Sequence, residues 1–249
     1  MIKKTTKILA VSVASALLIA AAGVQFSDFH KKFIRNKTAP NTVMVLNLEQ
    51  NSGGTGFYLK VPSGRSVIIT NRHVCELEKD GNILIKEEGS RLTAIHRVIT
   101  ISKNHDLCVI DANGKDKGLS LASDISVGDS VYVVGHPNLR PLIITEGDLI
   151  DKSTPSAVIH HMMKPEDAPE TCNGKIKEIE PLPGFKIPVC VQYDISYYIS
   201  AISYGGNSGS PVVNKYGNVI GVLFAGNQNV INDTMIVRLE DLREFIKDL

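Results

Sequence analysis

The sequence carries almost no net charge, no internal repeat and few cysteines, and each of these absences narrows the range of functions. Lys and Arg number 27 against 26 Asp and Glu, so the formal charge of +1 provides no long-range field that would attract nucleic acid or an acidic substrate. We therefore expect no nucleic-acid partner. Without low-complexity tracts, and with 43% hydrophobic residues, the chain is not disordered. Its 249 residues allow one large β domain or two small ones, with a core that does not depend on disulfides.

The N-terminus departs from this balance. Three lysines precede an uncharged, largely apolar, alanine-rich run over residues 8–24, which is the layout of a secretory signal, and the alanines at 20–22 are small residues that a signal peptidase reads. The run is also long enough for an uncleaved anchor, because spanning a membrane takes about 17 to 25 residues. We assign residues 1–23 to a signal peptide or a membrane anchor. An exported protein, periplasmic or secreted, is predicted, with residues 8–24 as its tether if the segment is retained.

We interpret residues 24–41 as a linker that connects the N-terminal segment to a β-rich domain. Four apolar residues of the linker recur at helical spacing, which predicts a helix lying on the body of the protein. From residue 42 onward, short β-branched runs alternate with Gly, Asn, Asp and Pro, a pattern typical of an all-β barrel or sandwich. The predicted strands are Thr42–Leu48, Gly56–Val61, Val67–Thr70, Ile83–Lys86, Leu92–Ile101, Leu107–Asp111, Ser130–Val134, Leu142–Ile150, Val189–Tyr193, Pro211–Asn214, Val219–Phe224 and Thr234–Val237. An apolar stripe among the charges of residues 238–249 predicts a terminal amphipathic helix.

The strand pattern weakens between about residues 153 and 189, where six prolines fall. Ordered loops of this length are uncommon without structure of their own, so we expect a hairpin on the surface that is closed by a covalent cross-link. Cys172 and Cys190 flank a segment with proline and glycine and form the one pair that the sequence suggests as a disulfide. Cys75 and Cys108 lie within apolar segments that resemble strands, and we interpret them as small buried residues.

The most informative segment is the glycine-rich turn over residues 205–211, which presents Ser208 immediately before an apolar strand. Glycines let the backbone approach a substrate and aim successive N–H groups at one point. Such donors stabilise the oxyanion that forms in acyl transfer. A serine hydroxyl is a poor nucleophile by itself, so it requires a base, which a third group must hold in the right tautomer.

Two further segments supply that base and that third group. His73 follows an apolar strand in the segment Ile69-Thr70-Asn71-Arg72-His73-Val74-Cys75. Asp106 lies at the start of another predicted strand, in the segment His105-Asp106-Leu107-Cys108-Val109-Ile110. The chain order of histidine, aspartate and serine matches one of the known arrangements of a serine nucleophile with its base. We therefore predict His73 as the general base and Asp106 as its orienting carboxylate.

These segments resemble the trypsin/chymotrypsin superfamily of serine peptidases, and in particular its bacterial HtrA (DegP-like) branch. The residues that carry the resemblance are Gly54-Thr55-Gly56-Phe57-Tyr58-Leu59, Thr70-Asn71-Arg72-His73-Val74, Asp106-Leu107-Cys108-Val109-Ile110, Val127-Gly128-Asp129, Gly135-His136-Pro137 and Gly206-Asn207-Ser208-Gly209. Each motif alone is weak, whereas all of them in the right order and spacing are specific. The resemblance covers nearly everything from residue 42 to residue 249, with His136 where the HtrA branch usually has Asn.

The resemblance implies an all-β fold of two six-stranded antiparallel β-barrels with a C-terminal α-helix. The first barrel would span about residues 42–118 and the second about 119–237, followed by the helix 238–249, so that residues 42–249 form the peptidase domain. The site would lie in the cleft between the barrels, where the first barrel supplies the histidine and aspartate and the second supplies the serine.

The resemblance also implies an oxyanion hole made by the N–H groups of Gly206 and Ser208, with that of Asn207 close by. Asn207 replaces the aspartate of the digestive enzymes, so activation through a freshly cut N-terminus is not expected. Ser210 stands where the family usually has glycine, a change that we expect to be tolerated. No PDZ module follows the terminal helix, so peptide binding of the HtrA type is not expected either.

The primary specificity pocket would be lined by Ile202, six positions before Ser208, and by Phe224, Ala225 and Gly226. Trypsin-like relatives that cleave after Arg or Lys carry an aspartate in this pocket, because a buried cation requires a paired charge. No carboxylate lies between residues 195 and 206 of this chain. We therefore predict cleavage after small or medium aliphatic residues, namely Val, Ala, Ile or Leu, with Arg, Lys and Asp disfavoured.

Other candidate groups have simpler interpretations. We read His105 and His136 as structural residues and Asp111 as a strand-end carboxylate. The run His160-His161-Met162-Met163 with Cys172 fits no zinc spacing, so we predict no metal and no cofactor. The expected partners are protein or peptide substrates. Two alternatives share the fold, namely a membrane-tethered processing or quality-control protease and an inactive protease homologue that acts as a binding module.

Overall fold

The computed structural model describes residues 29–47, 52–75, 82–162, 175–226 and 233–249. The predicted signal or anchor over residues 1–23 lies outside these residues. Among the helices of the described part, none is both long and apolar enough to cross a membrane.

The first barrel contains six antiparallel strands within the described residues, closed in the order β1-β2-β3-β6-β5-β4. Its strands are β1 (Thr42–Asn47), β2 (Ser52–Lys60), β3 (Ser66–Thr70), β4 (Asn82–Glu87), β5 (Thr93–Ile101) and β6 (Cys108–Asp111). They are rich in β-branched residues, whose side chains point alternately into and out of the barrel. Val43, Val45, Ile68, Ile83 and Ile85 fill the interior, and none is more than 2% exposed.

The second barrel is formed by the strands that follow. Among the described residues, these strands form one sheet in the order β13-β12-β11-β7-β8-β10-β9. An additional pairing of β13 with β10 closes the first six of them into a barrel. The strands are β7 (Ser130–Gly135), β8 (Ile143–Met162), β9 (Lys175–Leu182), β10 (Phe185–Ile199), β11 (Pro211–Asn214), β12 (Val219–Gly226) and β13 (Thr234–Arg238). The predicted fold of two six-stranded antiparallel barrels is confirmed.

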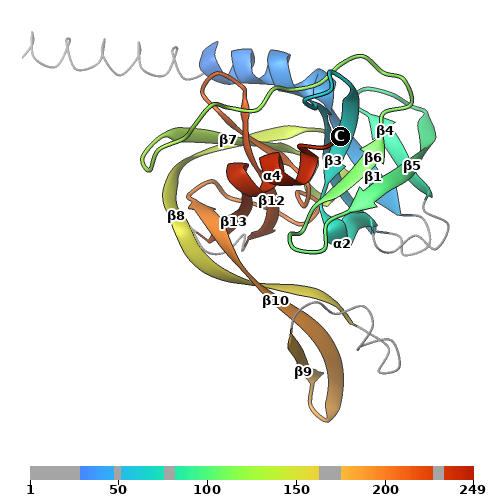
Figure 1. Ribbon diagram of the computed structural model, residues 1–249, viewed down its shortest axis with the longest axis vertical. Coiled ribbons are helices and arrows are strands. Elements are labelled where there is room, and N and C mark those ends of the chain that lie inside the picture. The colour runs from blue at the N-terminus through green and yellow to red at the C-terminus, as the bar shows by residue number, and fades with distance from the viewer. Residues whose placement is uncertain (1–28, 48–51, 76–81, 163–174, 227–232) are drawn as a thin grey trace, which may run out of the picture.

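Strands β8, β9 and β10 continue beyond the second barrel as a projecting arm, which is visible at the bottom of Figure 1. We call residues 154–162 and 175–196 the β arm. The sequence predicted that the strands end at Ile150 and resume at Val189, but β8 and β10 pair through this region. Pro155 has no N–H to donate, but it does not end β8. Strand β7 pairs with β8 only as far as Asp148, so the edge of β8 that faces away from β10 has no neighbouring strand at Pro155 and needs no donor there.

A third core joins the two barrels. Phe57 of β2 packs with Val134 of β7 and Val222 of β12, and all three are fully buried. Two helices cover this core. A helix over residues 29–38, followed by the 3-10 turn η1 (Ala39–Asn41), inserts Ile34, and the C-terminal helix α4 (Leu239–Ile246) inserts Leu242. The barrels are therefore packed against each other as one unit, and the loops at their junction are held in place.

Candidate active site

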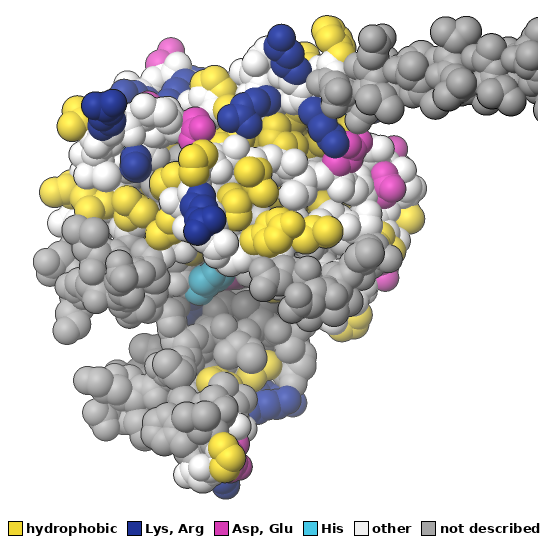
Figure 2. Space-filling model, turned by 180° about the vertical axis from the view of Figure 1, so that it is seen from behind, with side chains coloured by type: hydrophobic (Ala, Val, Ile, Leu, Met, Phe, Trp, Pro, Cys, Tyr) yellow, Lys and Arg dark blue, Asp and Glu magenta, His cyan; other side chains and the backbone are white. Residues whose placement is uncertain are grey.

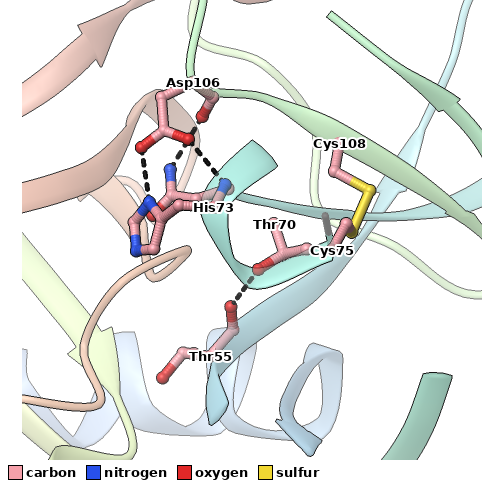
Figure 3. Close-up of a disulfide and its surroundings, with 7 residues drawn as sticks. Thr55, Thr70, His73, Cys75, Asp106 and Cys108 are labelled. Atoms are coloured by element: carbon pink, nitrogen blue, oxygen red, sulfur yellow. Dashed lines mark hydrogen bonds and ion pairs between the residues drawn. A yellow bond between two sulfur atoms is a disulfide. The ribbon is translucent and has the colours of Figure 1, made fainter. Parts of the chain in front are cut away.

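His73 lies on a single helical turn, α2 (Arg72–Cys75), that directly follows β3. The structure pairs Cys75 with Cys108, at the start of β6, in a disulfide (Figure 3). The prediction that these two cysteines are merely small buried residues was therefore wrong. Strand β6 is the neighbour of β3 in the barrel, with Thr70 opposite Cys108, so the turn after β3 comes back over the start of β6.

A sequence signal for this disulfide exists. Cys75 follows His73 by two residues, and Cys108 follows Asp106 by the same two. If His73 and Asp106 meet, the two cysteines are placed close together as well. The pairing predicted for Cys172 and Cys190 remains a prediction, since Cys172 lies outside the described residues.

His73 and Asp106 are joined by two hydrogen bonds. The backbone N–H of His73 donates to Oδ1 of Asp106 at 3.0 Å, and Nδ1 of the ring lies 2.7 Å from Oδ2. Asp106 is 2% exposed, and its own carbonyl oxygen accepts a hydrogen bond from the side chain of Asn71 at 2.9 Å. A buried carboxylate that accepts from Nδ1 places the proton on Nδ1, so Nε2 is the basic nitrogen. Figure 3 shows both contacts from Asp106 to His73.

Ser208 lies in a turn whose backbone only glycine can form. Gly206 and Gly209 have φ values of +87° and +84°. A Cβ atom on Gly209 would lie 2.0 Å from the carbonyl oxygen of Thr55, and one on Gly206 would lie 2.7 Å from the carbonyl oxygen of His136. Both positive φ and lack of space therefore require glycine on either side of the serine.

The turn is fastened to the first barrel by β2. The N–H of Thr55 donates to the carbonyl oxygen of Ser208 at 2.7 Å, and the Thr55 hydroxyl donates to the carbonyl oxygen of Gly206 at 2.9 Å. The hydroxyl of Thr70 in turn donates to the carbonyl oxygen of Thr55 at 2.7 Å. The sequence prediction did not assign a role to Thr55 or Thr70, although both stand within the segments that carry the family resemblance.

The predicted oxyanion-hole donors differ in their availability. The N–H of Asn207 donates to the carbonyl oxygen of Tyr204 at 3.0 Å, within the turn. In the part of the chain that the structure describes, the N–H groups of Gly206 and Ser208 donate to no other group. These two donors are therefore available to a substrate carbonyl oxygen.

The residues predicted to line the specificity pocket come from two segments of the second barrel. Phe224, Ala225 and Gly226 end β12, with Phe224 7% exposed, and Ile202 lies in the loop after β10 with 36% of its surface exposed. Gly226 packs so closely on the adjacent loop that a Cβ atom there would lie 2.2 Å from Oγ of Ser203. The sequence analysis did not identify this contact between Gly226 and Ser203.

His136 follows β7 and directly precedes the short 3-10 turn η2 (Pro137–Leu139), which contacts the glycine-rich turn of residues 205–211 through a hydrogen bond from the N–H of Asn138 to the carbonyl oxygen of Gly205. Its backbone N–H donates to the hydroxyl of Thr55 at 3.0 Å. The ring is fully buried, with Nδ1 3.0 Å from the carbonyl oxygen of Arg140. Burial lowers the pKa of His136, against the opposing effects of that hydrogen bond and of the nearby Glu88 carboxylate.

One group of three metal-ligating side chains occurs among the described residues, namely His105, Asp194 and Asp241. The prediction that the run from His160 to Met163 binds no metal is not addressed by this group, because the side chains of His160 and His161 lie outside the described set. Asp241 accepts two hydrogen bonds from Arg238, at 2.7 and 2.8 Å, so this group forms an ion-pair cluster.

The chain belongs to a known family. A family model described as a trypsin-like peptidase domain matches residues 54–222, more than half of the chain, and the chain is therefore a member of the trypsin-like peptidase family. This finding confirms the resemblance drawn from the sequence motifs.

Individual relatives agree with this assignment. The chain is 24% identical over 223 residues to a protein named serine protease HtrA-like from Staphylococcus aureus (strain bovine RF122 / ET3-1). The match covers 87% of this chain and 26% of the relative, so the chain spans about a quarter of the length of that protein. Among solved structures, the Rv3671c protease from M. tuberculosis in its active form is similar, with a TM-score of 0.62 and 18% identity over 85% of this chain and 81% of that one. Deg5 has a TM-score of 0.61 and 19% identity over 88% of this chain and 92% of that one. These two likenesses concern the fold.

Proposed function

We propose that this chain is a serine endopeptidase with Ser208 as the nucleophile, His73 as the general base and Asp106 as the orienting carboxylate. The observation that carries the proposal is the pair of hydrogen bonds between His73 and Asp106, in a chain of the trypsin-like peptidase family. This arrangement leaves Nε2 of His73 as the proton acceptor, which is what activation of a serine hydroxyl requires.

In the proposed reaction, Oγ of Ser208 attacks the carbonyl carbon of the peptide bond while its proton passes to Nε2 of His73. The buried carboxylate of Asp106 stabilises the imidazolium that results. When the tetrahedral intermediate collapses, His73 gives the proton to the departing amine, and the acyl group remains on Ser208. Water, deprotonated by His73, then hydrolyses the ester and returns the serine.

The oxyanion of the tetrahedral intermediate would be bound by the N–H groups of Gly206 and Ser208. Their lack of other acceptors in the described part of the chain supports this role. Each well-placed donor of this kind contributes about 3 kcal/mol to the stability of the transition state. The positive φ of Gly206 and the two hydrogen bonds from Thr55 favour a turn that is formed before substrate binds.

We further propose that the enzyme cleaves after Val, Ala, Ile or Leu. The support is the apolar pair Ile202 and Phe224 and the absence of a carboxylate in residues 195–206. An apolar pocket gains about 0.8 kcal/mol for each methylene that a substrate side chain buries, whereas an unpaired Arg or Lys charge would lose its hydration.

We also propose that the protein acts outside the cytoplasm on protein or peptide substrates. The apolar run at residues 8–24 supports export, and so does the Cys75–Cys108 disulfide, because disulfides persist mainly in oxidising compartments. Whether residues 8–24 are removed or kept as a tether is decided by the N-terminal sequence of the protein recovered from cells.

The activity is tested by incubating the purified protein with unfolded casein, with and without an organophosphate that phosphorylates active serines. Hydrolysis that the organophosphate abolishes, with the label found on Ser208 by mass spectrometry, is the expected result. Hydrolysis that resists the inhibitor, or a label on another serine, would overturn the assignment. An intact fold without any hydrolysis would favour the binding-module alternative.

A further inference from the structure

The β arm joins the body of the protein near Asp194. Strand β10 pairs with β13 at Tyr197–Ile199, inside the barrel, and Asp194 lies three residues before that contact, where it pairs across the arm with Ser156. The hydroxyl of Ser156 also donates to the carbonyl oxygen of Asp194 at 3.2 Å. Figure 2, seen from behind, shows the arm extending below the body, with charged and hydrophobic side chains exposed near its end. The backbone of Asp194 is thus fixed at the root of the arm.

The side chain of Asp194 contacts the loop that carries Asp106. Nδ1 of His105, the residue before Asp106, lies 2.6 Å from Oδ2 of Asp194, and the two side chains are 20% and 18% exposed. The backbone N–H of His105 is also fixed, because it donates to the hydroxyl of Ser102 at 3.1 Å. His105 is therefore held at both its backbone and its ring, the ring by a residue of β10 at the root of the β arm.

Charged groups from two more elements surround this pair. Nε2 of His105 lies 3.9 Å from Oδ1 of Asp241 on α4, and Arg238 at the end of β13 binds both oxygens of Asp241. The hydrogen bond to Asp194 is the largest influence on His105 and raises its pKa. The carboxylates of Asp194 and Asp241 act in the same direction, while burial and Arg238 oppose them.

We propose that His105 and Asp194 are positioning residues for the His73–Asp106 pair, a role that rests on the proposed function. His105 and Asp106 are consecutive, so a displaced His105 displaces the carboxylate that orients His73. The same contact fixes the first barrel against the second, which carries Ser208. Misplacement of a catalytic group by about 1 Å can cost on the order of 100-fold in rate.

The test compares His105→Ala, Asp194→Ala and the double variant in the full chain, with a peptide substrate and with active sites counted by the organophosphate end point. Each single change should lower kcat by roughly 10- to 100-fold while KM changes little, since positioning acts on the transition state. The double variant should be no worse than either single one, because the two side chains act as a unit. His105→Asn keeps an N–H donor near the position of Nδ1 and should recover most of the rate.

A pH profile separates positioning from a merely structural role. In the wild type, kcat should decline toward the level of His105→Asn as the pH rises through the raised pKa of His105, because the neutral ring keeps its hydrogen bond to Asp194 but loses the charge that strengthens it. This decline should be absent in His105→Asn, which does not titrate. Asp151→Ala is the matched control, since Asp151 lies on β8 beside the arm and its carboxylate accepts hydrogen bonds from the nearby Ser153 and Thr154. The control should retain the wild-type rate and profile.

Two outcomes would overturn the proposal in different ways. If the wild type hydrolyses the peptide and His105→Ala has the same kcat for each titrated site, the positioning role is wrong and the proposed function stands. If the wild type itself has no activity that depends on Ser208, the proposed function fails and the positioning role fails with it. Should the alanine variants not fold, Asp194→Asn, which keeps the shape and removes the charge, decides in the same way through kcat and its pH profile.

Discussion

The hydroxyl of Thr55 in the first barrel donates a 2.9 Å hydrogen bond to the carbonyl oxygen of Gly206 in the glycine-rich turn of residues 205–211. The same hydroxyl accepts a hydrogen bond from the N–H of His136 at 3.0 Å, and the N–H of Thr55 donates to Ser208. Thr55 is fully buried, so one residue binds three backbone groups, from two segments, around the proposed oxyanion hole.

Thr55→Val should therefore impair both stability and catalysis. Valine has the shape of threonine but leaves the carbonyl of Gly206 and the N–H of His136 without partners, and each unsatisfied buried group costs about 1 to 3 kcal/mol. We expect a lower denaturation midpoint and a lower kcat, with weaker binding of a peptide aldehyde that mimics the oxyanion. Thr55→Ser keeps the hydroxyl and is the control. Equal kcat in the valine and serine variants would contradict the role of the hydroxyl.

Ser208→Ala should lower kcat by roughly 10⁴-fold or more while the denaturation midpoint stays near that of the wild type. His73→Ala should be about as damaging, since the two residues act together. In the wild type, kcat/KM should fall in mildly acid solution as the ring of His73 takes up a proton and can no longer act as a base. A flat profile through this range, or activity that survives the alanine at position 208, would speak against the triad.

His136 should make the fold less stable in acid. Burial lowers the pKa of this histidine in the folded state, so the unfolded chain takes up the proton first, and stability is lost as the pH falls below the ordinary value of about 6.5. His136→Asn cannot take up this proton. Urea denaturation at pH 7.5 and 5.5 should show a smaller loss of stability in the variant, and an equal loss in both proteins would refute the assignment.

Loss of the Cys75–Cys108 disulfide should destabilise the protein. The bond joins residues 33 apart in the sequence, and closing a loop of that length stabilises by about 4 kcal/mol on chain-entropy grounds. Cys75→Ala/Cys108→Ala should lower the free energy of unfolding by about this amount, and a reductant should destabilise the wild type more than the variant. Free thiols at both positions in the purified exported protein would show that the bond does not form.

Ile202→Asp should change the residue after which the enzyme cuts. A carboxylate in the pocket pairs with a substrate cation and disfavours aliphatic side chains. Sequencing the products of a digested unfolded protein should show cuts after Val, Ala, Ile or Leu for the wild type and a shift toward Arg and Lys for the variant. A majority of wild-type cuts after Arg or Lys would show that Ile202 does not line the pocket.

Many of the strands could be predicted from the sequence, because a strand of a barrel leaves a local pattern of residues. The β-branched runs at Val67–Thr70 and Pro211–Asn214 correspond to β3 and β11, since the period of a strand is visible in a few residues. The length of β8 was not legible, because proline normally ends a strand. Whether Pro155 is tolerated depends on which edge of β8 has a neighbour, and that is a property of the whole sheet.

The sequence by itself determined an all-β domain, through the pattern of its strands, and a candidate triad, through motifs whose order and spacing are specific. The arrangement as two barrels followed from the resemblance of those motifs to a known family. Only the tertiary structure decided which distant groups meet. Thr55 binds a residue 151 positions away, and His105 binds one 89 positions away. A side chain's partner across such a separation is set by the packing of the barrels against each other, and no local pattern of residues records it.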